Sequence, residues 1–365
     1  MKKSLKIRWI ISIISFFLAA AAIIPARLST TFADWYAFTV YPFLQGLFSR
    51  ISGIFPFSLG EIMVIAAVIT VLFGIVYFII QLVKSGGTRR KVVHSALATT
   101  VMTLSLVAVM FVYNCGINYY RSPFSAYSGL SVEKYSKEEV REVLEHIIIS
   151  ANFSFLEIET AENGSCILPV DYLDLTTAAM KNIAEQYPVL NSYYPHAKPV
   201  LLSEPWCYTR IVGVFTPFSM EANYNTCNTT ESIGHTICHE LSHLTGFMRE
   251  DEANFIAYLA CRESGNSYLM YSGYFHTMCQ LLNAYHSVCT SEEYGEIYSL
   301  ISPGVSKQIT LKNEYWSQFE TPVAEVSSTI NDTYLKANNQ TDGEKSYGRM
   351  VDLVIADYFG NVKEK

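Results

Sequence analysis

The chain has 365 residues, enough for one membrane module and one sizeable globular domain; half of its residues are apolar and only 16% are charged. The charges are unevenly distributed, because the residues up to Asn114 include ten Lys and Arg but two acids, whereas the remainder includes 16 basic and 31 acidic residues. A domain this acidic lacks the concentrated positive charge that nucleic acids require, so nucleic acid is excluded as an expected partner.

Three apolar, uncharged stretches predict helices that cross a membrane, because each approaches or exceeds the roughly 20 residues that a bilayer requires. Ser58 and Glu61, at the start of the second stretch, have the spacing of a capping box, which marks the beginning of a helix. Small residues near the end of the first stretch leave open the alternative that it is a cleaved signal peptide. We expect a membrane module in residues 1–120 and the lipid bilayer as a partner, with spans at about residues 9–26, 62–83 and 94–114.

Basic residues predict how this module is oriented. They gather before the first span and between the second and third, while the loop between the first two spans holds only Arg27 and Arg50. By the positive-inside rule, the N-terminus is cytoplasmic and the chain after the third span lies outside. We therefore expect a multi-pass membrane protein with an extracytoplasmic domain in residues 121–365. The aromatic-rich loop between the first two spans is typical of a segment at the membrane interface.

The outer domain is expected to be mostly helical with a small β-sheet, an α+β fold. Ser136 and Glu139 form a second capping-box pattern ahead of a helix, and another helix is expected at about residues 173–185. Within residues 199–225, the segments 200–202 and 211–215 are apolar and bounded by prolines, which is typical of short strands. Helices are expected again from Glu231, with breaks near Gly246, Gly265, Thr290, Pro303 and Pro322.

Eight cysteines occur without any CxxC pair, which argues against a zinc ribbon or a thioredoxin-type redox site. Two alternatives remain open. Disulfides are possible in an extracytoplasmic domain, and Cys207 and Cys227 flank the expected strands. Buried free thiols are equally consistent, because Cys238 and Cys261 lie in apolar helical contexts.

Residues His239–His243 have the sequence HExxH within a stretch that is expected to be helical. Residues four apart share one helix face at about 6 Å, so the imidazoles of His239 and His243 can converge on one metal ion. Neutral imidazole suits Zn²⁺, which lowers the pKa of bound water towards neutrality. Glu240 lies about 100° around the helix, where it can accept a proton from water as general base and return it to a leaving amine.

The following segment offers a third metal ligand. Gly246 can end the first helix in a left-handed conformation, and a second amphipathic helix then begins with several acids. Glu250 and Glu252 both qualify, but they point about 200° apart on a helix and only one can reach the metal. We prefer Glu250, because Asn254 one turn later can orient it or brace the first helix. The other glutamate is expected to be a solvated surface acid. The hypothesis is one Zn²⁺ per chain.

This segment resembles the gluzincin-like zinc metallopeptidases, in which HExxH is followed by a helix carrying Glu-x-x-x-Asp or Glu-x-x-Ala-Asn/Asp. Residues Glu250–Asn254 match the second pattern, and the resemblance implies that the first glutamate is the ligand. It also implies a zincin-like fold for the outer domain. The position of Gly246 is similar to that in metzincins, but Arg249 stands where their third histidine belongs, which disfavours that class.

Nearly the full chain resembles a bacterial membrane-protein family known only as a domain of unknown function, family 3810. The resemblance implies three membrane spans and an outer zinc-peptidase-like domain, and no substrate. It is carried by four segments: Pro56–Glu61, Phe215–Asn223, His239–Asn254 and Tyr334–Asn338.

The stretch before the HExxH helix is a candidate substrate-binding strand. In zincins the strand ahead of that helix lines the cleft and pairs with extended substrate, as a strand added to a sheet edge. We assign that role to residues Gly213, Phe215, Glu221 and Asn223, with Phe215 or Phe218 forming a side-chain pocket. The alternative, equally consistent with the sequence, is an ordinary connection with aromatic residues in the core.

Other candidate residues have weaker support. His235 lies one turn before His239 and is too far along the helix axis to be a third ligand, so we expect it to support the ligands or to fill the core. His276 and His286 are expected to be ordinary helix residues. Tyr347 is a candidate donor to the oxyanion of a tetrahedral intermediate, and docking of its ring on the fold is the alternative.

These patterns favour a membrane-anchored zinc metallopeptidase that hydrolyses peptide bonds in a peptide or protein substrate. Two rival functions remain. One is a binding or sensor module that keeps the metal site without turnover. The other is an envelope scaffold in which HExxH is incidental.

Overall fold

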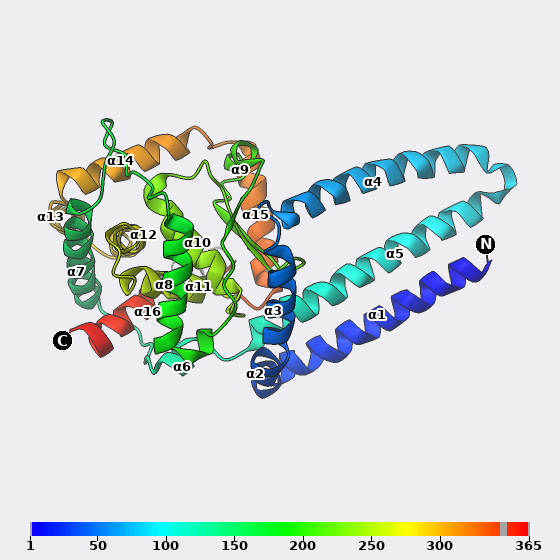
Figure 1. Ribbon diagram of the computed structural model, residues 1–365, viewed down its shortest axis with the longest axis horizontal. Helices are drawn as coiled ribbons and strands as arrows, with labels where there is room; N and C mark the ends of the chain where they lie inside the picture. Colours follow the sequence, from blue (N-terminus) through cyan, green and yellow to red (C-terminus); the bar gives the residue numbers. More distant parts are fainter. Residues whose placement is uncertain (1, 344–348, 364–365) are drawn as a thin grey trace.

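The computed structural model describes residues 2–343 and 349–363, and shows three long helices projecting from a mostly helical globular domain (Figure 1). The N-terminal part of the chain contains α1 (Lys2–Leu28), α2 (Thr30–Thr39), α3 (Tyr41–Ser52), α4 (Leu59–Lys84), α5 (Arg89–Asn114) and the 3₁₀ helix η2 (Gly116–Tyr120). The globular domain contains α6 (Ser125–Ser128), α7 (Lys137–Leu156), α8 (Tyr172–Gln186), β1 (Lys198–Pro199), α9 (Ser203–Cys207), β2 (Gly213–Thr216), β3 (Glu221–Tyr224), α10 (Thr230–His243), α11 (Glu250–Arg262), α12 (Ser267–His286), α13 (Ser291–Tyr298), α14 (Pro303–Ser317), α15 (Pro322–Ala337) and α16 (Met350–Asp357).

Helices α1, α4 and α5 are each long and apolar enough to cross a membrane, which confirms the prediction of three apolar N-terminal helices. Helix α1 packs along α5, where the guanidinium of Arg8 donates to the hydroxyls of Ser95 and Thr99 at 3.1 and 2.7 Å. Helix α4 diverges from α5 towards the globular domain (Figure 1), and none of its most apolar stretch is buried within the described protein. The membrane helices are therefore a packed pair with a third helix standing apart.

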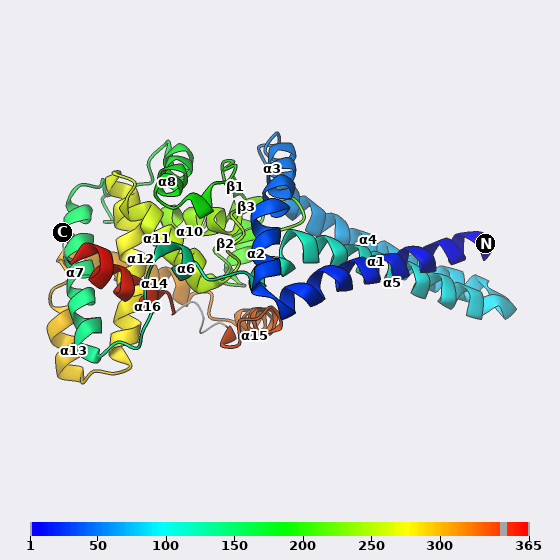
Figure 2. The same cartoon turned by 90° about the horizontal axis from the view of Figure 1, so that it is seen from below.

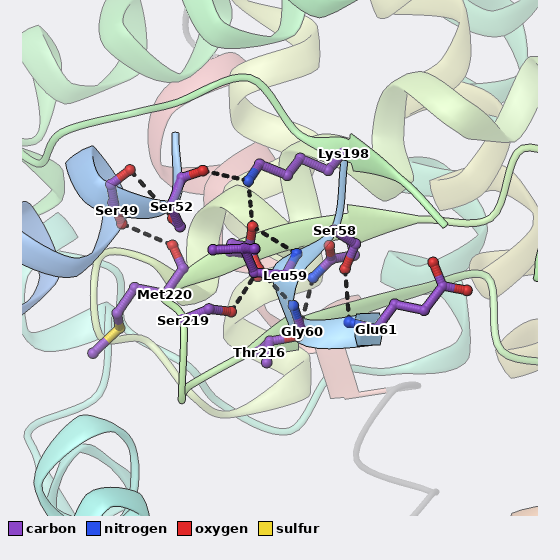
Figure 3. Close-up of polar contacts among 12 residues, drawn as sticks. Ser49, Ser52, Ser58, Leu59, Gly60, Glu61, Lys198, Thr216, Ser219 and Met220 are labelled. Atoms are coloured by element: carbon purple, nitrogen blue, oxygen red, sulfur yellow. Dashed lines mark hydrogen bonds and ion pairs between the residues drawn. The ribbon is translucent and has the colours of Figure 1, made fainter. Parts of the chain in front are cut away.

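The start of α4 is bonded to the globular domain (Figure 3). The hydroxyl of Ser58 accepts from the Glu61 N–H at 2.9 Å, which confirms the predicted helix start. The Glu61 carboxylate does not return to Ser58 as in a capping box. It accepts from the N–H groups of Leu201 and Leu202 at 2.7 and 2.8 Å. A strand was predicted at residues 200–202, but β1 covers Lys198–Pro199, and Val200 only extends its pairing by donating to the Tyr224 carbonyl at 3.1 Å. Residues 201 and 202 form a turn, because their backbone donors are taken by the Glu61 side chain.

A three-stranded sheet has the order β1-β3-β2, with β1 parallel and β2 antiparallel to β3. Strand β2 is therefore an edge strand. Gly213 pairs with Tyr224 and Thr216 with Glu221. The Asn225 N–H donates to the Val212 carbonyl at 2.9 Å. Because N–H and C=O directions alternate along an antiparallel strand, Gly213 and Phe215 direct theirs to the open edge.

The core of the globular domain surrounds α10, which is buried from Ile233 to His243 and packs against α8, α11, α12 and the sheet. Other predicted boundaries are confirmed. The reciprocal capping box of Ser136 and Glu139 begins α7, Thr290 caps α13, and Pro303 and Pro322 begin α14 and α15. All eight cysteines, each among the described residues, are free thiols in this structure.

Candidate metal centre

The turn between α10 and α11 brings the HExxH residues and the acids of the next helix together. Gly246 has φ +88°, the left-handed conformation that was predicted from its position after the helix. A Cβ at this position would also lie 3.0 Å from Nη1 of Arg121. The left-handed backbone conformation therefore strongly favours glycine here, and the close approach of Arg121 leaves little room for a side chain.

Three side chains converge at this turn. The Nε2 atoms of His239 and His243 lie 3.2 Å apart. Oε2 of Glu250 lies 3.1 Å from the first and 3.7 Å from the second. All three residues are buried, and one ligand atom from each lies within 4.8 Å of the others. Nitrogen and carboxylate oxygen donors at this spacing can hold a metal ion.

Hydrogen bonds orient both imidazoles for ligation. Nδ1 of His239 donates to Oδ1 of Asn254 at 2.8 Å, and Nδ1 of His243 donates to the Phe247 carbonyl at 2.8 Å. A proton held on each Nδ1 leaves the lone pair of each Nε2 directed at the shared centre. The donor set therefore fits a metal ion, and Asn254 lies where the sequence predicted a supporting residue.

The charges at the centre favour ligation as well. Burial alone would raise the pKa of Glu250, but its hydrogen bonds with His239 and His243 hold that pKa well below its usual range, so the carboxylate is ionised. Burial alone would lower the pKa of His243, but its hydrogen bond with Glu250 and the negative charge raise that pKa to about 9, so a metal ion would take the place of the Nε2 proton. Glu250 thus attracts positive charge to this position.

Glu240 lies beside this group under strand β2. Its carboxylate accepts from the Phe215 N–H, and burial raises its pKa to about 7 even though the nearby histidines oppose the shift. A Cβ at Gly213 would lie 2.5 Å from Oε1 of Glu240, so only glycine lets the strand pass this close. A carboxyl group with a pKa near neutrality is suited to accept and return protons.

A cleft of about 830 Å³ opens over the centre and is lined by His239, Glu240, His243 and Glu250. Its walls come from residues 209–215 around β2, from α10 to α12, from helix α15, and from Cys115 and Tyr119, which follow α5. Gly213 and Phe215 line it, as predicted for substrate-binding residues. The walls from α15 and from the residues after α5 were not foreseen, because no local pattern indicates that these distant segments meet at the site.

Glu221 and Asn223 were also predicted to bind substrate, and the structure places both outside this cleft. Glu221 forms a buried ion pair with Lys198 and accepts from the Gly60 N–H at 2.8 Å, which ties the sheet to α4 (Figure 3). The Asn223 amide donates to the Thr216 hydroxyl at 3.0 Å and to the Val214 carbonyl at 3.2 Å, so it braces the strand pair. Their side chains are used inside the fold, and neither reaches the cleft that the prediction placed them in.

Glu252 differs from the expectation of a solvated surface acid. It is buried, accepts from the Phe124 N–H at 2.7 Å and pairs with Arg249 through two contacts of 2.9 Å. The loop before α6 covers this side of α11, which accounts for the burial. Glu252 therefore anchors that loop, while Glu250 faces the histidines.

His235 supports the centre from one turn earlier on α10. Its Nε2 lies 3.3 Å from the Asn254 carbonyl, and its ring stacks on His276 with centroids 3.8 Å apart. Burial lowers the pKa of His235 to about 3 and that of His276 well below its usual range, so both rings are neutral. His276 lines the cleft and is not the ordinary helix residue that was expected; its separation from His239 in sequence hid this role. Tyr347 lies outside the described residues.

Comparison with known proteins identifies the family. No curated protein and no solved structure matches the chain significantly. A family model does match, over most of the chain, and the match includes the apolar helices α4 and α5 and the candidate metal centre, while α1 lies outside it. The chain belongs to the family described as protein of unknown function (DUF3810), whose model covers residues 36–355.

Proposed function

We propose that this protein is a membrane-anchored, zinc-dependent peptidase whose zincin-like domain hydrolyses peptide bonds on the extracytoplasmic side of the bacterial cell membrane. The observation that carries the proposal is the convergence of His239, His243 and Glu250 beside a buried Glu240, beneath the open edge of a strand. One zinc ion per chain would be held by the two Nε2 atoms and the Glu250 carboxylate. Three protein ligands are typical of a catalytic site, whereas closed structural sites use four.

The residues around the centre would have separate roles in hydrolysis. When bound, zinc supplies a Lewis acid that acidifies water and polarises a carbonyl group. Glu240 accepts the proton of the attacking water and delivers it to the leaving amine, for which its raised pKa is suited. Asn254 and the Phe247 carbonyl keep both histidines in the tautomer that ligation needs.

Strand β2 supports a peptide as the substrate. Gly213 directs its N–H and its C=O, and Phe215 its C=O, to the open edge that lines the cleft. An extended peptide would add there as a further strand, which positions a scissile bond over Glu240. The Phe215 N–H is already accepted by Glu240, so the strand and the base are held in one arrangement.

The decisive experiment compares three single substitutions in the full chain, purified in detergent. Glu240→Gln should keep about one zinc per chain and lose roughly 10²–10⁴-fold in peptide hydrolysis, the usual contribution of a general base. Glu250→Gln should lose the metal. Glu252→Gln is the matched control and should keep it. Hydrolysis that survives in Glu240→Gln, or a wild-type protein without metal, would contradict the proposal.

A metal-holding sensor is the second candidate, and one contact favours it. The Tyr41 hydroxyl, on α3 of the membrane module, donates to the His243 carbonyl at 3.3 Å. The metal helix is thereby linked to the membrane module. Wild-type protein that binds zinc and cuts no peptide would favour this candidate. The proposed peptidase is preferred, because a sensor that only holds a metal ion would need neither a buried general base such as Glu240 nor an open strand edge to bind a peptide.

A further inference from the structure

The outer wall of the cleft is built from the end of a membrane helix and from one exposed helix. Cys115 directly follows the last residue of α5, and its Sγ lies 3.6 Å from Sδ of Met248. Met248 is two residues before the ligand Glu250. Two residues span at most about 7 Å, so the metal ligands lie on the order of 10–15 Å from the end of α5.

Helix α15, which forms the rest of this wall, carries an apolar stripe on its surface. Val323, Val326, Ile330 and Tyr334 are 53, 59, 65 and 39% exposed. At 100° per residue they lie within about 80° of one another. The charged residues Glu325, Asp332 and Lys336 are on the opposite side of the helix. Ile330 and Tyr334 also line the cleft, so the stripe forms its lip.

This helix is held at the end of the membrane module. The Tyr334 ring packs edge-on against Phe111, which lies inside the apolar helix α5, with ring centroids 6.2 Å apart. Its hydroxyl lies 3.0 Å from that of Tyr119, and the Asn339 amide donates to the Tyr119 carbonyl at 3.3 Å. The C-terminal end of α15 therefore lies beside the C-terminal end of the apolar helix α5.

Helix α3 marks the same boundary, because it lies between the ends of two membrane helices, α1 and α4 (Figures 1 and 2). Its outer side is also apolar and exposed, with Phe43, Leu47 and Ile51 at helical spacing. Its other side forms hydrogen bonds with the globular domain; for example, the Ser49 hydroxyl donates to the Met220 carbonyl at 2.8 Å. Two amphipathic helices thus border the module, one of them at the cleft.

We propose that the stripe of α15 lies in the lipid interface, so that the cleft opens at the membrane surface and takes the membrane-adjacent segments of anchored polypeptides as its substrates. An amphipathic helix in this position buries its apolar side among headgroups and acyl chains. A substrate that leaves the bilayer beside α5 needs only a few extended residues to reach Glu240, at about 3.3 Å per residue. The substrate class rests on the proposed peptidase function, whereas the lipid contact of α15 does not.

The lipid contact is tested first, in full-chain protein reconstituted in vesicles of phosphatidylcholine and phosphatidylglycerol. A fluorophore on Ile330→Cys should be quenched severalfold more by lipids with a nitroxide near the headgroup than one on Val288→Cys. Val288 is exposed and precedes α13, at the end opposite the membrane helices (Figure 1). Phe43→Cys is the positive control. The background replaces three half-buried cysteines by serine: Cys227, Cys279 and Cys289.

Quenching at Ile330 no stronger than at Val288 would overturn the lipid contact. Crosslinking of two chains through Ile330→Cys would also overturn it, since a second copy would then cover the stripe. Neither result depends on hydrolysis.

The substrate class is tested with a probe set in the same vesicles. Each probe has one membrane span followed by an unstructured segment of varied sequence, and cut positions are read by mass spectrometry. Cuts should fall within about ten residues of the span, given the reach above. Untethered copies of the segment should be cut more slowly, and Glu240→Gln should cut neither. Cuts spread evenly along the segment, or equal rates for tethered and free segments, would overturn the substrate class alone. No cuts in either would overturn the peptidase proposal with it.

Discussion

Oδ1 of Asn254 lies 2.8 Å from Nδ1 of His239. This hydrogen bond fixes which ring nitrogen carries the proton and directs Nε2 at Glu250 and His243. The two residues belong to successive helices, α10 and α11, so the same contact also sets how the helix with the histidines meets the helix with the carboxylate.

Asn254→Ala is expected to weaken zinc binding by roughly 10–100-fold, the usual effect of removing the partner of a ligating histidine. Asn254→Asp should bind close to the wild-type level, because a carboxylate also accepts from Nδ1. Competition with a chromogenic chelator measures both affinities. Equal affinity in wild type and Asn254→Ala would show that the hydrogen bond does not orient the ligand.

Gly213→Ala is expected to lower hydrolysis by about 10²-fold with little change in zinc affinity, because small displacements at a reacting centre have effects of this size. The new Cβ would lie 2.5 Å from Oε1 of Glu240 and 2.9 Å from Cγ2 of Thr236, so the base must move. Gly295→Ala is the matched control, since nothing lies within 4 Å of its Cβ position. Unchanged turnover in Gly213→Ala would count against Glu240 as the base.

Glu221→Gln is expected to destabilise the protein by about 3–5 kcal/mol, because it leaves the Lys198 charge buried without its partner. The two side chains are only 1 and 6% exposed. Glu145→Gln, which breaks an exposed pair with Arg141 at 3.0 Å, should cost no more than about 1 kcal/mol. The midpoint of thermal unfolding in detergent compares the two. Similar midpoints would show that Glu221 does not anchor the sheet to α4.

His276→Phe is expected to make stability less sensitive to acid. The pKa of His276 is lowered in the folded protein, mainly because the ring is buried. The neighbouring His235 and the positive charge of Lys312 lower this pKa further. The unfolded chain therefore takes up a proton below about pH 6.5 that the folded chain excludes, so this contribution to stability is present above that pH and lost as pH falls. The loss is up to about 1.4 kcal/mol per pH unit for each such histidine.

Unfolding midpoints at about pH 7 and pH 5 measure this effect, with a chelator present so that metal release contributes to neither variant. The difference between the two pH values should be smaller in His276→Phe than in wild type. His286→Phe, at an exposed position at the end of α12, is the control and should leave the difference unchanged. A His276→Phe variant as acid-sensitive as wild type would contradict a neutral, buried His276.

Some features of the centre were predictable because they are local. The spacing of His239 and His243 places two imidazoles on one helix face, and Gly246 ends that helix in the left-handed conformation. The choice between Glu250 and Glu252 was only weighted by sequence. It required the structure, where the contacts of Glu252 with Arg249 and Phe124 occupy one carboxylate and leave the other facing the histidines.

Sequence alone determined the three apolar helices, the helix boundaries at capping residues and the order of candidate ligands, since each follows from side-chain chemistry within a few turns of chain. Tertiary structure decided which polar groups serve the fold and which face the cleft. Glu221 and Gly60 lie 161 residues apart yet share a hydrogen bond. The walls of the cleft likewise join segments that are distant in sequence, namely Cys115 and Tyr119 after α5, and helix α15. Such contacts depend on how distant segments pack, because burial and partner choice are properties of the assembled fold and not of any local pattern.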